Sequence, residues 1–302
     1  MASKYLVLGG SSGGYLAIMV SRLLGIEYGN IVVKKFPDEE TYIRIVNDVA
    51  GKIVVYINSL QPSPNDKIIE TIYTLYTLKD LGAEKVYAFI PYMAYARQDE
   101  RFTAGEVVSI EILAKLFRDI ETDGIYTIDM HLHRISDPRA LFGENFYNLT
   151  AIPLLADYVK KHYELDKPIV IGPDEESLQW ARVMAECLGG LKYDVLIKKR
   201  VSAEEVIIEV ANVDVSDRDV ILVDDIISTG GTMAESLKAL YNLGAKRVLV
   251  TCVHALLVGK AYEKILSYKP LDMVATDTVL SPISRVSIAP LIARTIEEDI
   301  MS

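Results

Sequence analysis

The chain has 302 residues, of which 50% are hydrophobic and 25% charged, so it has the composition of a globular protein with ample material for a core. Its formal net charge of −10 argues against a general nucleic-acid binder, since such proteins are usually basic. The sequence contains no run of about 18 apolar residues and enters YLVLGG without a secretion signal, so we expect a cytoplasmic protein with no membrane span. Cys187 and Cys252 lie in apolar contexts and are predicted to be small core residues.

Short apolar runs alternate along the chain with stretches of helical period. The runs are apolar at both odd and even positions, as expected of strands buried on both faces. They read YLVLG, IVVYIN and VYAFI in the first half, then IVIG, VILV and RVLVTCV in the second. Two of the helical stretches close on Leu-Gly-Ala, where glycine is expected to end a helix. The alternation predicts an α/β protein in which mostly parallel sheets are flanked by helices.

The second half of the chain repeats the first. The offset stays between 162 and 166 residues for four pairs of landmarks: Gly25 with Gly189, Lys34 with Lys198, Asn58 with Asp224, and Gly82 with Gly244. Chance similarity would not hold this register, so we predict two tandem copies of one domain. The expected boundary lies in GENFYNLT at 143–150, giving domains of residues 1–147 and 148–302.

Two polar segments follow predicted strands of the first half. In YARQDER, Arg97 can bind a phosphate through two hydrogen bonds, although a solvated surface cluster is the alternative. In GIYTIDMHLHR, His131 and His133 have the two-residue spacing that places side chains on one face of a strand. That arrangement suits a metal ion, and for His133 a purely structural role is an equal alternative.

Two charged segments lie near predicted strand ends of the second half. Asp174 closes IVIGPD, and we interpret the following Glu175 and Glu176 as acids of a first helical turn rather than as metal ligands. In IKKR, Lys198 and Arg200 alternate along an extended chain, so they share a face and can act together. A solvated basic strand end is the alternative for these two residues.

The segment ILVDDIISTGGTM at 221–233 is the most informative. Asp224 and Asp225 are expected just beyond the carboxyl end of a strand, where open parallel sheets bind ligands. A helix is expected to begin near Met233, and a helix N-terminus favours phosphate through its free N–H groups and its dipole.

The loop between the acids and that helix is suited to an anion. Gly230 and Gly231 let the backbone approach closely, and three hydroxyl groups can donate hydrogen bonds, those of Ser228, Thr229 and Thr232. The aspartates would repel a phosphate, so we expect them to accept hydrogen bonds from sugar hydroxyls. A ribose 5-phosphate meets both requirements. The lysine of a Walker A loop is missing, which disfavours an ordinary P-loop ATPase.

VILVDDIISTGGT resembles the phosphoribosyl-binding loop of the type I phosphoribosyltransferase superfamily. With the tandem arrangement, further segments extend the resemblance to the ribose-phosphate pyrophosphokinases over nearly the whole chain: FPDEETYIRI at 36–45, PYMAYARQDERFTAGE at 91–106, DMHLHRI at 129–135, GPD at 172–174 and IKKR at 197–200. The resemblance implies two phosphoribosyltransferase-like domains. It also implies a Mg²⁺-dependent transferase of nucleotide biosynthesis, which moves the β,γ-diphosphoryl group of ATP to the 1-hydroxyl of ribose 5-phosphate.

The resemblance implies roles for individual residues. The implied catalytic residues, at the start of a mobile loop RVSAEEV, are Lys198 and Arg200. The implied ATP-binding residues are Phe36, Asp38, Glu40, Arg97, Gln98 and Asp99. Ribose 5-phosphate would be bound by Asp224, Asp225, Ser228, Thr229, Gly230, Gly231 and Thr232, and the metal by His131 and Asp174.

The two copies differ where this chemistry is expected. The first copy has Phe36 in place of Arg200 and reads NSLQPSPN in place of DDIISTGG, so we expect one ribose 5-phosphate site per chain, in the second copy. By resemblance, the first copy forms part of an adenine pocket that reaches into a neighbouring subunit, which implies a homodimer or a larger homo-oligomer. Ser228 stands where many relatives carry aspartate, so no general base is assigned.

The sequence argues against three alternative interpretations. A phosphoribosyltransferase that uses the product has a similar loop in a single domain, and the tandem copy, RQDE and DMH argue against it. A non-catalytic regulatory homologue should have lost residues such as Asp174 and Lys198, which are present. The glycine-rich GGSSGG at 9–14 lacks the spacing of a dinucleotide-binding motif.

Overall fold

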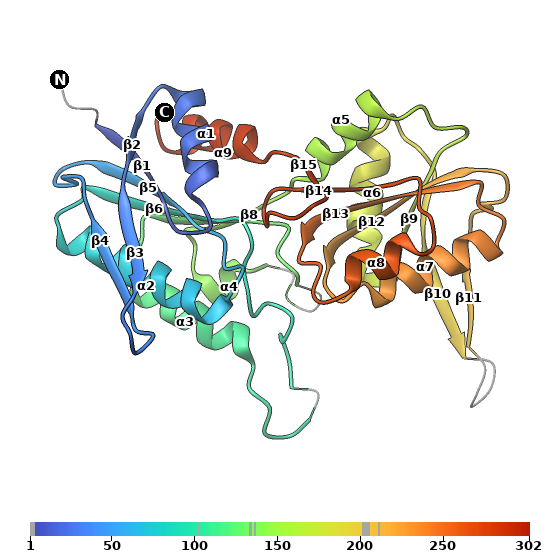
Figure 1. Ribbon diagram of the computed structural model, residues 1–302, viewed down its shortest axis with the longest axis horizontal. Helices are drawn as coiled ribbons and strands as arrows, with labels where there is room; N and C mark the ends of the chain where they lie inside the picture. The colour runs from blue at the N-terminus through green and yellow to red at the C-terminus, as the bar shows by residue number, and fades with distance from the viewer. Residues whose placement is uncertain (1–3, 102, 133–134, 136, 201–205, 211) are drawn as a thin grey trace. The chain divides into compact units, whose positions relative to one another are not determined.

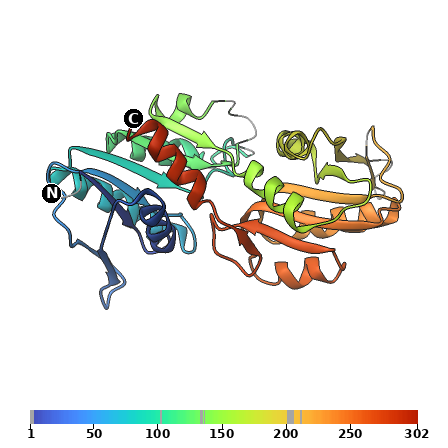
Figure 2. The same cartoon turned by 90° about the horizontal axis from the view of Figure 1, so that it is seen from above.

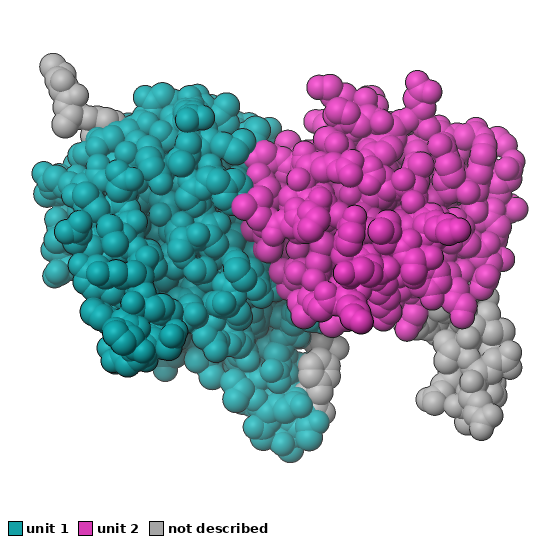
Figure 3. Space-filling view, in the orientation of Figure 1, with its two compact units in different colours: residues 1–149, 288–302 teal, residues 150–287 magenta. Residues whose placement is uncertain are grey.

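The computed structural model describes residues 4–302 except 102, 133–134, 136, 201–205 and 211, and describes only the backbone of residues 198–200 and 206–209. The chain forms two compact units, which Figure 3 distinguishes by colour. Unit 1 comprises residues 1–149 and 288–302, and unit 2 comprises residues 150–287. Among the helices described, none is long and apolar enough to cross a membrane.

Unit 1 is built on a six-stranded parallel sheet with strand order β2-β1-β5-β6-β7-β8. Its strands are β1 (Tyr5–Gly9), β2 (Glu27–Gly29), β5 (Ile53–Ile57), β6 (Lys85–Ile90), β7 (Gly124–Ile128) and β8 (Phe146–Leu149). Its helices are α1 (Gly14–Leu24), α2 (Pro64–Asp80), α3 (Ser109–Asp119), α4 (Arg139–Phe142) and α9 (Ala289–Asp299). Helices α1 and α9 cover one face of the sheet, and α2 and α3 cover the other (Figures 1 and 2).

Unit 2 has a seven-stranded sheet with order β11-β10-β9-β12-β13-β14-β15, parallel except for β11. Its strands are β9 (Ile169–Gly172), β10 (Tyr193–Arg200), β11 (Val206–Val210), β12 (Asp219–Ile227), β13 (Arg247–Ala255), β14 (Asp272–Thr276) and β15 (Ser284–Val286). Its helices are α5 (Ile152–His162), α6 (Leu178–Cys187), α7 (Gly231–Asn242) and α8 (Ala261–Leu266), with a short 3₁₀ helix at Glu175–Ser177. Helices α5 and α6 pack together, as do α7 and α8 (Figure 1).

The strand orders confirm both the α/β class and the internal repeat. Strands β2-β1-β5-β6-β7-β8 of unit 1 correspond in order to β10-β9-β12-β13-β14-β15 of unit 2. An antiparallel hairpin follows the second strand in each copy: β3 (Ile31–Lys35) with β4 (Thr41–Ile45) in unit 1, and the distal part of β10 with β11 in unit 2. The predicted match of Lys34 with Lys198 therefore joins two hairpins of the same kind.

The division of the chain differs from the expected one in its last segment. Residues 288–302, expected in the second domain, belong to unit 1, because α9 packs against α1 and buries Leu291, Ile292 and Ile296. This segment lies outside the repeat, so the repeat alone could not assign it. The observed boundary between residues 149 and 150 lies two residues beyond the expected one.

Three local expectations are corrected by the structure. Strand β12 continues through Asp224 and Asp225 to Ile227, because it stays paired with the equally long β13. Helix α7 begins at Gly231 instead of near Met233. Of the two cysteines, Cys252 is buried as predicted, whereas Cys187 is exposed at the end of α6.

An ion pair between the partly exposed Arg247 and a buried carboxylate anchors the start of β12. The Asp219 carboxylate is buried and accepts hydrogen bonds from the Arg247 side chain at 2.9 Å and from the Asp166 backbone N–H at 2.6 Å. The hydrogen bonds from Arg247 hold the pKa of Asp219 below its ordinary value of 3.8. The interaction therefore stabilises the fold above about pH 4, and this contribution is lost as the pH falls through the lowered pKa.

We expect Asp219→Asn to lower the free energy of unfolding by about 2 kcal/mol at pH 7, because the buried charged partner of Arg247 is removed. Urea unfolding of the variant and the wild type measures this difference, which should shrink below pH 4 as the wild-type carboxyl is protonated. Asp217→Asn is the matched control, since Asp217 forms an exposed pair with Lys167. Equal losses in the two variants would contradict the anchoring role.

Candidate active site

Three acidic residues of unit 2 lie where the order of its strands reverses, at the switch point of the sheet. The chain leaves β9 toward β10 on one side, and β12 leads toward β13 on the other, so the switch point of the sheet lies between β9 and β12. Ligands of open α/β sheets bind at the carboxyl ends of the strands at such a point. Asp174 follows β9 by two residues, while Asp224 and Asp225 lie near the carboxyl end of β12.

The three carboxyl groups influence one another. Burial, and then the nearby carboxylates of Asp225 and Asp174, raise the pKa of Asp224 well above its ordinary value. Asp225 is 1% exposed, and its backbone N–H donates to Asp224 Oδ1 at 3.0 Å. A site that concentrates negative charge in this way favours a partner that donates hydrogen bonds or carries positive charge, as sugar hydroxyls and hydrated cations do.

Asp174 also caps the short helical turn that follows it. Its Oδ1 accepts a hydrogen bond from the backbone N–H of Ser177 at 3.1 Å, and the Ser177 hydroxyl oxygen accepts one from the Asp174 N–H at 3.2 Å. Glu175 and Glu176 occupy that turn and are exposed, in agreement with their interpretation as first-turn acids. The cap fixes the position of Asp174 beside β12.

The loop of residues 228–230 joins β12 to the N-terminus of α7. Gly230 has the left-handed conformation (φ 70°, ψ 11°) and is the N-cap residue of α7. The Ser228 carbonyl accepts a hydrogen bond from Val258 N–H at 2.9 Å, so the segment after β13 supports the loop. A β-carbon on Gly230 would lie 3.0 Å from the Ala261 carbonyl oxygen, which explains why a glycine is needed there.

Lys198 and Arg200 lie on the part of β10 that extends beyond the sheet. Strand β10 pairs with β9 only as far as Val195 opposite Gly172, and then continues in a hairpin that pairs Lys198 with Ile208 and Arg200 with Val206. Both residues therefore leave the sheet at the carboxyl end of β9, the end that carries Asp174. The predicted mobile loop at 201–205 lies outside the described residues.

Four of the implied nucleotide and metal residues follow neighbouring strands of unit 1. Arg97 is exposed and Gln98 and Asp99 are partly buried in the segment after β6, while His131 is partly buried after β7. Because β6 and β7 are adjacent and parallel, their carboxyl ends lie at the same edge of the sheet. The two histidines were expected to lie on one face of a strand. This expectation is wrong for His131, because β7 ends at Ile128 and Asp129 has φ 39°. His133 lies outside the described residues.

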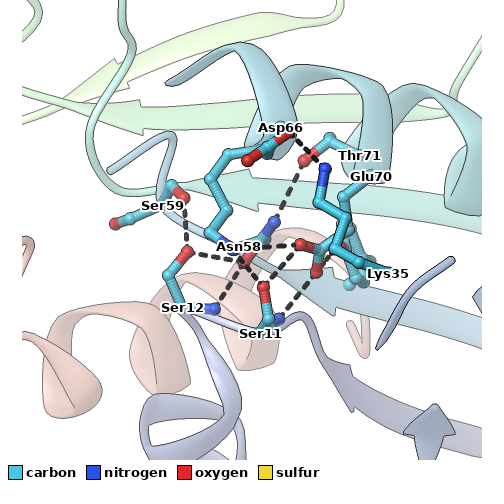
Figure 4. Close-up of polar contacts among 10 residues, drawn as sticks. Ser11, Ser12, Lys35, Asn58, Ser59, Asp66, Glu70 and Thr71 are labelled. Atoms are coloured by element: carbon cyan, nitrogen blue, oxygen red, sulfur yellow. Dashed lines mark hydrogen bonds and ion pairs between the residues drawn. The ribbon is translucent and has the colours of Figure 1, made fainter. Parts of the chain in front are cut away.

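The remaining implied nucleotide residues form the tip of the β3–β4 hairpin. The side chains of Phe36, Asp38 and Glu40 are exposed there, and Phe36 packs edge-on against Tyr42 with ring centres 5.7 Å apart. Lys35 fastens the tip to α2, because its ammonium donates to the Glu39 carbonyl at 3.0 Å and to Asp66 at 2.5 Å (Figure 4). An exposed aromatic ring held in this way can stack on a base.

The corresponding switch point of unit 1, between β1 and β5, is filled by side chains of the protein itself (Figure 4). The buried Glu70 carboxylate accepts hydrogen bonds from the Ser11 N–H at 2.7 Å and from the Ser11 hydroxyl at 2.5 Å. Asn58, the repeat partner of Asp224, accepts the Ser12 N–H at 3.1 Å and donates to Thr71 at 3.2 Å. The switch point of unit 1 is therefore occupied by its own side chains, whereas that of unit 2 carries strand-end acids and a glycine loop.

The residues of the site suit a divalent cation that is held mainly by its substrate. Carboxylate oxygens, as on Asp174, are ligands that Mg²⁺ prefers, and this ion usually keeps several waters or phosphate oxygens. Among the described residues, no group of three or more His, Cys, Asp or Glu is arranged to hold a metal ion. Asp174 can therefore offer a single carboxylate ligand to such an ion.

Within unit 2 the structure brings the implied sugar residues together. In unit 1 the implied nucleotide residues lie in two separate places, after strands β6 and β7 and at the tip of the β3–β4 hairpin. The support of the loop by Val258 and Ala261 was missed from the sequence, because these contacts join segments about 30 residues apart and leave no local pattern.

Comparisons with known proteins agree with this architecture. Residues 5–120 match the family described as the N-terminal domain of ribose phosphate pyrophosphokinase, and residues 147–282 match the phosphoribosyl transferase domain. A ribose-phosphate pyrophosphokinase of Methanopyrus kandleri is 38% identical over 97% of this chain and 98% of its own length. Ribose-phosphate pyrophosphokinase 2 of Archaeoglobus fulgidus is 40% identical over 94% of this chain and 97% of its own.

A solved structure extends the similarity to the whole fold. The crystal structure of phosphoribosylpyrophosphate synthetase from Mycobacterium smegmatis has a TM-score of 0.86 at 27% identity and covers 97% of both chains. These matches confirm the resemblance drawn from the sequence, the two phosphoribosyltransferase-like domains and the prediction of an enzyme. The chain belongs to the family of ribose-phosphate pyrophosphokinases.

Proposed function

We propose that the enzyme transfers the β,γ-diphosphoryl group of ATP to the 1-hydroxyl of ribose 5-phosphate, giving phosphoribosyl pyrophosphate and AMP. The observation that carries the proposal is the switch point of unit 2, where strand-end carboxylates precede a glycine loop and a helix N-terminus. The loop binds the 5-phosphate through backbone N–H groups and hydroxyls. Asp224 and Asp225 accept hydrogen bonds from the ring hydroxyls and so orient the sugar.

The reaction exchanges one P–O bond of ATP for a new P–O bond to the sugar. The 1-hydroxyl oxygen bonds to the β-phosphorus while the bond from that phosphorus to the oxygen shared with the α-phosphate breaks; AMP leaves and the hydroxyl proton is released. Lys198 and Arg200 stabilise the negative charge that develops on the transferred group. Arg97 and Gln98 bind the phosphates and ribose of ATP, and Asp99 lies beside them in sequence.

The hairpin tip of Phe36, Asp38 and Glu40 binds the adenine ring. When Mg²⁺ is bound, His131 would hold it together with the phosphate oxygens of ATP, and Asp174 would hold a second ion beside the ribose; these ions would neutralise charge on the nucleotide. The exposed tip supports a site completed by a second copy of the chain, so we propose a homo-oligomer that acts in the cytoplasm.

An assay of the purified protein with ATP, Mg²⁺ and ribose 5-phosphate tests the proposal by measuring AMP. The expected result is one AMP for each phosphoribosyl pyrophosphate formed, with no AMP when the sugar phosphate is omitted. Release of pyrophosphate from phosphoribosyl pyrophosphate and a base, with no AMP formed from ATP, would show a phosphoribosyltransferase instead.

We expect Asp225→Ala to raise the KM for ribose 5-phosphate by about 10- to 100-fold, because a buried carboxylate that accepts a sugar hydroxyl is lost. The KM for ATP should change little. Asp225→Asn, which keeps the volume and one acceptor oxygen, should lose less. Steady-state kinetics with each substrate varied in turn measures the effect, and equal losses for both substrates would exclude the proposed hydroxyl contact.

A further inference from the structure

Helix α8 lies directly against the loop that begins α7. Ala261, its first residue, is so close to Gly230 that a β-carbon on that glycine would lie 3.0–3.2 Å from Ala261 atoms. Lys264 stands three residues later in the same helix, so it shares the face of Ala261. The contact between the two helices thus determines which α8 side chain reaches the loop.

The ammonium of Lys264 lies beside the first residue of α7. A β-carbon on Gly231 would be 3.6 Å from the Lys264 Nζ and 3.9 Å from the Thr229 hydroxyl oxygen. A cation and a hydroxyl donor therefore lie around the same point at the helix N-terminus. Within the described part of the chain, the Lys264 ammonium has no hydrogen bond or ion pair with a protein group.

This placement is electrostatically unfavourable in the free protein. The N-terminus of a helix carries partial positive charge, and α7 has 12 residues, so a lysine ammonium there is repelled by the helix dipole. Lysine would normally be placed near a helix C-terminus, where the dipole stabilises it. A bound anion removes the penalty, because it is attracted by the dipole and the ammonium together.

We propose that Lys264 is a binding residue for the 5-phosphate of the sugar substrate, acting from α8 together with the loop of residues 228–232. The inference rests on the proposed function, which places that phosphate on the loop, and adds a cation that the loop itself lacks. The long lysine stem lets the ammonium follow the phosphate. Lys264 therefore contributes to the affinity for ribose 5-phosphate and not to the chemical step, because no bond of the 5-phosphate is made or broken.

Kinetics of Lys264→Met, Lys264→Arg and Lys238→Met test the inference. We expect Lys264→Met to raise the KM for ribose 5-phosphate about five- to twentyfold, with the KM for ATP and kcat at saturation nearly unchanged. Lys264→Arg should stay within about twofold of the wild type, because it keeps the charge. Lys238→Met is the matched control, since it removes one exposed charge from α7 two turns from the loop.

A binding measurement separates this inference from the proposed function. Hydrogen exchange of the amides of residues 229–232 is followed while inorganic phosphate is added to each protein, with no turnover required. Weaker protection in Lys264→Met than in Lys238→Met supports the inference even if the wild type forms no AMP. Equal protection in the two variants, or an equal rise in both KM values, overturns it even if the wild type is fully active.

Discussion

Replacing Lys198 by alanine is expected to lower kcat by about 100- to 1,000-fold, while ATP still binds with nearly unchanged affinity. The transferred diphosphoryl group carries its greatest negative charge on the oxygens around the reacting phosphorus in the transition state. A cation that contacts these oxygens mainly at that stage contributes little to substrate binding and much to the rate. Single-turnover measurement of AMP, together with ATP titration, separates the two effects.

The backbone of β10 supplies a matched control for this prediction. Alternate residues of an extended segment share one side, so we propose from the sequence that Lys198 and Arg200 act together without the intervening Lys199. Lys199→Ala removes the same charge from the same strand and should retain most of the activity. Similar turnover in the Lys198 and Lys199 variants would remove Lys198 from the mechanism.

Replacing Gly230 by valine is expected to raise the KM for ribose 5-phosphate more than 100-fold, that is, by over about 2.7 kcal/mol of binding free energy. Two causes act together. A β-branched residue is strained at φ 70°, and its β-carbon would lie 3.0 Å from the Ala261 carbonyl, so α8 and the loop must separate. The N–H groups of the loop then lose their common orientation toward the phosphate. ATP affinity, which we assign to unit 1, should change little.

Gly190→Val separates backbone strain from the loss of the phosphate site. Gly190 also belongs to unit 2 and has φ 81°, but a β-carbon there would meet no atom within 4 Å. Its replacement should lower stability with little effect on the KM for ribose 5-phosphate. If the two glycine variants showed the same kinetics, the loop geometry would not be the basis of sugar-phosphate binding.

The regular parts of the fold could be predicted because each depends on a local pattern. Runs that are apolar at both odd and even positions correctly predicted strands such as β5 and β9. Gly82 and Gly244 follow helix ends as predicted, with φ of 81° and 89°. The placement of α9 in unit 1 depends on a contact with a helix more than 260 residues earlier, and no local signal predicts it. The extension of β12 through two aspartates depends likewise on its partner β13.

The candidate site was predictable to a similar degree. The DDIISTGGT segment shows its chemistry in one short stretch, since acids, hydroxyls and glycines follow one another along the chain. Lys264 was not predicted, because its position beside Gly231 arises from the packing of α8 on α7 and from no pattern around residue 264. Likewise, the filling of the unit 1 switch point by Glu70 requires α2 to bring that side chain to Ser11.

Hydrogen exchange of the full-length protein with and without saturating ribose 5-phosphate is the most direct test of the assignment of the sugar site to unit 2. We predict slower exchange for the amides of residues 228–232, which are donors to the 5-phosphate, and no change at residues 10–13 or 58–60 of unit 1, where the protein's own side chains fill the switch point. Protection at those unit 1 segments, with none in the loop of unit 2, would contradict the account.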